Sequence, residues 1–109
     1  MIDMGMIREK IVQELLSWPD VTVQPHRFGG VEFLFRGREI GHMHGEQIVD
    51  ILFPMPIRNQ LATDGRAKPH HMFPESGWIT FYIDGPDHIQ SAIELLRVQY
   101  DRFKAKKGW

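Results

Sequence analysis

The stretch VEFLFRGREIGHMHGEQIVDILF, from Val31 to Phe53, decides the fold because it contains three strand-like runs separated by short turns. The runs cover residues 31–35, 39–43 and 47–53, and Gly37 and Gly45 lie in the turns between them. Runs of this length that end at glycine turns are typical of consecutive antiparallel strands. The stretch therefore predicts an antiparallel meander.

Alternation along these runs assigns side chains to the two faces of the sheet. In 39–43 it places Ile40 and His42 on one face, and it leaves the other face to Glu39, Gly41 and Met43. Asp50 is a charged residue inside an otherwise apolar run. Its side chain needs a partner, a sheet edge or an open pocket, because an unpaired buried carboxylate is costly.

The flanking sequence completes an α+β pattern. Helical periodicity predicts a first helix over about 4–18, a short helix near residues 56–63, and a last helix to about Lys104. Asp87 and Gln90 have the spacing of a capping box at the start of that last helix. Further strands are expected over 21–23, 67–73 and 78–83. We expect a single domain over 1–109, with an antiparallel sheet of about five or six strands and both terminal helices on one face.

Composition narrows the class of protein. The chain has 109 residues, no cysteine and a formal net charge of -1. The lack of cysteine excludes disulfides and fits a reducing cytoplasm, where we expect the protein to be. No apolar run approaches the roughly 20 residues that span a bilayer, and we expect no signal peptide and no membrane partner. The balanced charge argues against a nucleic-acid partner.

Four motifs together resemble the luciferase domain family of bacteria and fungi. They are REIGHMHG (38–45), VDILF (49–53) before a proline-containing helix with Arg58, HHMFPESGWITF (70–81), and AIELLR (92–97). The resemblance extends from about Val21 to Phe103 and implies a small domain without a defined reaction. The order of elements is also similar to the MmcQ/YjbR-like fold. No glycine-rich loop between strand and helix indicates a flavin or nucleotide, so the cofactor is unknown.

Histidines supply the candidate chemistry. His42 and His44 are two apart on a predicted strand, so both point to one face, where they could offer two imidazoles to a metal. His70 or His71 could add a third ligand, and Glu46 or Asp50 an acidic one. The alternative is a pair of histidines that are hydrogen-bonded to neighbours or face water.

Each of the remaining candidates could have either a structural role or a functional one. His70 and His71 alternate in a predicted strand, so at most one of them joins a site. Arg58 could hold an anion at a helix start, or could pair with Asp50 or Asp64. Ser76 fits a turn better than a nucleophile. Trp78 could line a pocket or fill the core.

Three functions remain open, and the third, nucleic-acid binding, follows only from the loose analogy with the MmcQ/YjbR-like fold. The first is a domain that binds a small molecule, either as an enzyme or without catalysis. The ligand-binding candidates are His42, His44, Asp50, Arg58, His70, His71, Ser76 and Trp78. The second is a non-catalytic protein-interaction module, such as a homodimer, with an apolar surface supplied by Met1, Met4, Met6, Met43, Met55 and Met72.

Overall fold

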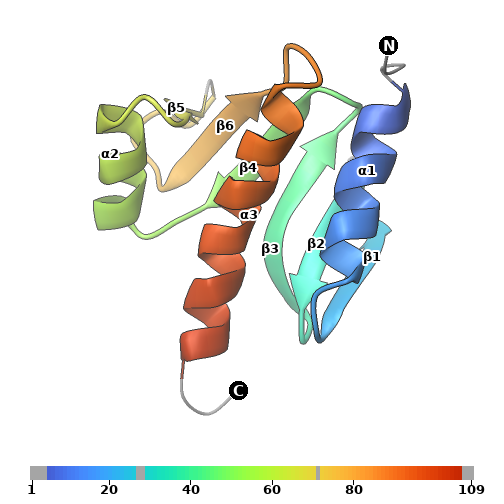
Figure 1. Cartoon of the computed structure of the whole chain (residues 1–109). Coiled ribbons are helices and arrows are strands. Elements are labelled where there is room, and N and C mark those ends of the chain that lie inside the picture. The colour runs from blue at the N-terminus through green and yellow to red at the C-terminus, as the bar shows by residue number, and fades with distance from the viewer. Residues whose placement is uncertain (1–4, 27–28, 71, 107–109) are drawn as a thin grey trace.

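The computed structural model describes residues 5–26, 29–70 and 72–106. These residues form three helices and one six-stranded sheet (Figure 1). The elements in chain order are α1 (Gly5–Leu16), β1 (Val21–Pro25), β2 (Val31–Phe35), β3 (Arg38–His44), β4 (Ile48–Leu52), α2 (Met55–Thr63), β5 (Lys68–Pro69), β6 (Trp78–Tyr82) and α3 (His88–Ala105). The strand order is β1-β2-β3-β4-β6-β5, and all neighbours are antiparallel. The predicted α+β class is confirmed.

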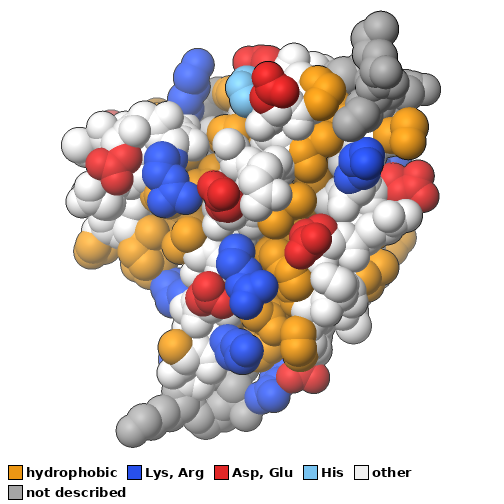
Figure 2. Space-filling view, in the orientation of Figure 1, with side chains coloured by type: hydrophobic (Ala, Val, Ile, Leu, Met, Phe, Trp, Pro, Cys, Tyr) orange, Lys and Arg blue, Asp and Glu red, His pale blue; other side chains and the backbone are white. Residues whose placement is uncertain are grey.

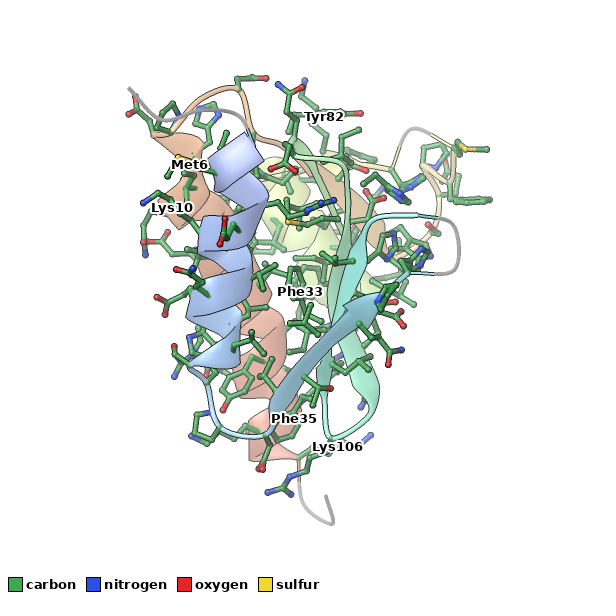
Figure 3. The ribbon with its side chains drawn as sticks, turned by 90° about the vertical axis from the view of Figure 1, so that its right-hand side faces the viewer. Met6, Lys10, Phe33, Phe35, Tyr82 and Lys106 are labelled. Atoms are coloured by element: carbon green, nitrogen blue, oxygen red, sulfur yellow. The ribbon has the colours of Figure 1, made fainter. Side chains whose placement is uncertain are left out.

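Helices α1 and α3 cover one face of the sheet, as predicted (Figure 1). Seen edge-on, Phe33 and Phe35 point from the sheet toward these helices (Figure 3). The core between the two layers is apolar, and its fully buried members include Ile7, Ile11, Phe33, Met43, Ile51, Leu96, Tyr100 and Phe103. Burial of this apolar surface is the main force that holds the helices on the sheet.

The pairing of β2 with β3 shifts by one residue, so the predicted faces of β3 are partly wrong. Phe33 pairs with Gly41 and Leu34 pairs with Glu39, which leaves Ile40 without a partner in β2. This is a β-bulge, and an extra residue breaks the alternation of side chains. Ile40 therefore belongs to the apolar core, and Glu39 lies on the same face as His42.

Two local predictions fail. Strand β5 covers only Lys68–Pro69 of the predicted 67–73, because the chain turns there and the backbone N–H of Met72 bonds to the ring of His70 instead of to a strand. Asp87 makes no side-chain capping hydrogen bond at the start of α3. The backbone N–H groups of His88 and Ile89 donate instead to the carbonyls of Gly85 and Pro86.

The helix side of the molecule has mixed charge. Lys, Arg, Asp and Glu side chains are interspersed over α3 and its surroundings (Figure 2). None of the helices in the described part of the chain has the length and apolar character needed to cross a bilayer.

Candidate functional site

A row of polar side chains crosses the sheet on the face that α1 and α3 leave uncovered. Its members are cross-strand neighbours in register, one from each strand: Gln24, Glu32, His42, Asp50, Thr80 and Lys68. Directly opposed side chains of neighbouring strands lie within contact distance of each other. The pairing of the strands thus brings His42 against Asp50, and Asp50 against Thr80.

Asp50 is the centre of a cluster that also includes three histidines. Its side chain is 1% exposed, and its Oδ1 accepts a 2.7 Å hydrogen bond from Thr80 Oγ1. The other oxygen, Oδ2, lies 3.4 Å from Nε2 of His42, 3.3 Å from Nε2 of His44 and 3.5 Å from Nε2 of His70. Asp50, which the sequence indicated as a charge that needs a partner, therefore has several partners.

His42 lies between two carboxylates. Its Nδ1 is 3.0 Å from Glu39 Oε2, and its Nε2 faces Asp50. A carboxylate can only accept a hydrogen bond, so both ring nitrogens of His42 are donors and the ring is cationic. Burial opposes this charge, but the bonds to Asp50 and Glu39 outweigh burial and raise the pKa of His42 to about 9.

The two carboxylates respond in the opposite direction. Burial tends to raise the pKa of Asp50, but the hydrogen bonds from His42 and Thr80 outweigh burial and lower it. The same balance of burial against the His42 bond lowers the pKa of Glu39. Glu39, His42 and Asp50 thus form a charged chain across β3 and β4.

His44 differs from His42 although both point to one face. Its side chain is 39% exposed. Burial and, next, the positive charge of His42 lower the pKa of His44. The ring is therefore neutral at physiological pH and stands at the edge of the cluster.

His70 is positioned by the loop that follows β5. Its Nδ1 accepts a 3.1 Å hydrogen bond from the backbone N–H of Met72. In the neutral ring the proton is then on Nε2, which faces Asp50. At most one of His70 and His71 was expected to join a site. His70 lies in this cluster, and His71 lies outside the described residues.

His26, which the sequence did not indicate, packs against the cluster from the end of β1. Its ring stacks on His42 with centroids 4.3 Å apart and meets His44 edge-on at 5.8 Å. The backbone N–H of His26 donates a 3.2 Å hydrogen bond to the carbonyl of Gly30, and Gly30 lies so close to β3 that a Cβ at this position would be 1.8 Å from the carbonyl oxygen of Met43. Only glycine permits this approach.

These residues line a cavity of about 890 Å³. Trp78 meets His42 at 5.3 Å between ring centroids, and Phe73 meets His70 at the same distance. The wall combines polar and apolar side chains, which are Gln24, Pro25, His26, Glu32, Glu39, His42, His44, Asp50, His70, Met72, Phe73 and Trp78. The cavity thus has a charged floor and a partly aromatic wall.

Arg58 and Ser76 are not among the residues that line this cavity. Arg58 donates from Nη2 to the carbonyl of Pro74 and from Nη1 to Asn59. Among the described residues neither Asp50 nor Asp64 forms an ion pair with it, so the predicted ion pair is wrong. Ser76 Oγ donates to the carbonyl of Phe73 at 2.6 Å and accepts from the N–H of Trp78, which is the turn chemistry expected of it.

Comparison with known proteins supports one assignment. The family model described as "Luciferase domain" matches residues 37–99. The chain belongs to the luciferase domain family. No curated protein and no solved structure matches the chain significantly. The part of the chain that matches the luciferase domain contains Glu39, the three histidines around Asp50 and Trp78, whereas His26 precedes it.

The arrangement in this luciferase domain offers three kinds of chemistry. A neutral imidazole at a cavity wall can accept or donate a proton. Two sets of side chains, His42-His44-Asp50 and His26-Glu39-His42, have ligand atoms within 4.8 Å of one another and could hold a metal ion. The aromatic wall can stack on a planar molecule.

Proposed function

We propose that this domain binds a small organic molecule in the cavity above Asp50 and its histidines. The observation that supports the proposal is the position of the buried cluster, which faces a cavity of about 890 Å³ and not the apolar core. Buried charges destabilise a fold unless they are paired, and the partners of Asp50 include three histidines that line this cavity. The volume is within the usual range for small-molecule sites, roughly 300–1,000 Å³.

The lining suggests an amphipathic ligand. Phe73 and Trp78 offer aromatic surface for a planar, apolar body. His44 is half-exposed at the floor and can bond to a polar group of the ligand. If the domain catalyses a reaction, His44 is the residue best placed to exchange a proton with the ligand.

Protein-observed NMR tests the proposal with benzoate, phenol and indole as probes. We expect shifts at His44 and Trp78 and none at His88, which lies at the start of α3. Phe73→Ala should weaken binding several-fold, because Phe73 supplies apolar wall. The matched control is Met55→Ala, which alters an exposed apolar residue of α2 outside the cavity. Equal shifts over the whole surface, or equal weakening by both variants, would contradict the proposal.

The interaction-module alternative has less support. Of the methionines expected to form an apolar surface, Met43 is fully buried, and Met1 and Met4 lie outside the described residues. Met6, Met55 and Met72 are exposed but belong to α1, α2 and the loop before β6. A homodimer stays a prediction, which light scattering of the purified protein tests.

A further inference from the structure

We propose that His42, His44 and Asp50 bind a divalent transition-metal ion of the zinc type. The site goes beyond binding of an organic molecule and stands even if no such molecule is found. The ligand atoms would be Oδ2 of Asp50 and Nε2 of both histidines. Nε2 of His42 lies 3.4 Å from that oxygen, and Nε2 of His44 lies 3.3 Å from it. Each of the three residues offers one ligand atom that lies within 4.8 Å of those of the other two.

The spacing suits ligands around an ion, which would displace the proton that Nε2 of His42 carries in the metal-free chain. An N–H···O hydrogen bond is about 2.7–3.2 Å long, so the contacts of Asp50 Oδ2 with these two histidines are long for hydrogen bonds. Around a tetrahedral zinc ion with bonds of about 2.0–2.1 Å, neighbouring ligand atoms are about 3.3 Å apart. The separations of Oδ2 from both imidazole nitrogens agree with the second value.

The surrounding contacts orient the ligands. Glu39 Oε2 is 3.0 Å from Nδ1 of His42, which leaves Nε2 to face the site. Thr80 occupies Oδ1 of Asp50 and leaves Oδ2 for the ion. Histidine ligands usually donate their other N–H to a carboxylate or carbonyl, and such partners fix the ring. His42 and Asp50 are also paired residues of β3 and β4, so the backbone ladder holds them in place.

The remaining histidines are not ligands in this arrangement. His70 accepts the Met72 N–H at Nδ1, so its Nε2 carries a proton and donates toward Asp50. The second possible set, His26-Glu39-His42, draws on Glu39, whose Oε2 already bonds to Nδ1 of His42. The three proposed ligands leave a coordination position toward the cavity, where water or a bound molecule would complete the shell.

Isothermal titration of the full chain, stripped with chelator and then given ZnCl₂ alone, tests the site. We expect one ion per chain. His44→Ala should weaken binding about 100-fold or more, and Glu39→Gln about 10-fold to 100-fold, which is the usual effect of a partner of a ligand. His88→Ala should bind as the wild type does, and His26→Ala should weaken binding far less than His44→Ala does. Circular dichroism confirms that each variant is folded, and His44 is exposed enough to be replaced without loss of the core.

Two results would overturn the proposal. One is the absence of stoichiometric binding by the folded wild-type chain. The other is an affinity that falls in His26→Ala but not in His44→Ala, which would assign the ion to the second set. Because the titration contains no organic probe, its failure is distinct from failure of the small-molecule proposal.

Discussion

The hydroxyl of Thr80 donates a 2.7 Å hydrogen bond to Oδ1 of Asp50. Both residues are almost fully buried, and they face each other across β4 and β6. This bond fixes the plane of the carboxylate and directs Oδ2 toward the histidines. The orientation of the whole cluster therefore depends on a residue that does not line the cavity.

Thr80→Val should lower the free energy of unfolding by about 2 kcal/mol, because the substitution keeps the shape of the side chain but removes a hydrogen bond to a buried charge. Urea unfolding measures the loss. Thr22→Val is the matched control: Thr22 is an exposed strand residue, and its change should stay within about 0.5 kcal/mol. Similar losses in both variants would show that the Thr80 hydroxyl has no special role.

Stability of the metal-free protein should depend on the charge of His42. The folded pKa is about 9 against an ordinary 6.5, so the folded state holds this proton more tightly than the unfolded chain does. The stabilisation is complete below pH 6.5 and is lost as the pH rises through about 9. Urea midpoints in chelator should fall over this window in the wild type and much less in His42→Gln. Parallel curves would contradict the assignment, and NMR titration of the ring gives the pKa directly.

Gly77 should not tolerate a side chain. A Cβ at this position would be 2.0 Å from the carbonyl oxygen of Phe53, and the carbonyl of Gly77 accepts the Phe53 N–H at 3.0 Å. Gly77→Ala must therefore push β6 away from the end of β4, at a cost of about 2 kcal/mol or more. At Gly85 nothing lies within 4 Å of an added Cβ, so Gly85→Ala should leave thermal unfolding almost unchanged. A stable Gly77→Ala protein would show that these two segments are less tightly joined.

The hydroxyl of Tyr100 joins α3 to the turn after α1. It donates a 2.9 Å hydrogen bond to the carbonyl of Pro19, and the ring is fully buried. Tyr100→Phe should cost about 1 kcal/mol, because the carbonyl loses a buried partner. Tyr82→Phe removes an exposed hydroxyl and should have little effect on chemical denaturation. If the two variants were equally stable, water would replace the lost bond at Pro19.

Much of the fold follows from local pattern. The glycine turns between 31 and 53 predict the meander, and the spacing of His42 and His44 places both rings on one face. Asp50 was recognisable as a residue that needs partners, because a charge inside an apolar strand is rare. Local signals sufficed here because antiparallel strands joined by short turns pair with their sequence neighbours.

The rest of the site depends on features that alternation does not encode. Glu39 reaches His42 only through the bulge at Ile40, and His26 lies beside His42 where Gly30 closely approaches β3. His70 enters from a loop that was predicted as a strand. Pairing register could have indicated Glu32 and Thr80, which are cross-strand neighbours of His42 and Asp50, but register is not visible until the strands are paired.

The bulge in β3 also separates what the site needs from what the core needs. Leu34 pairs with Glu39 and Phe33 pairs with Gly41, so a chain without Ile40 would have regular alternation and would still place Glu39 on the face of His42. Ile40 itself contributes its side chain to the apolar core. Deletion of Ile40 would therefore remove a core side chain and leave the second carboxylate of His42 on its own face.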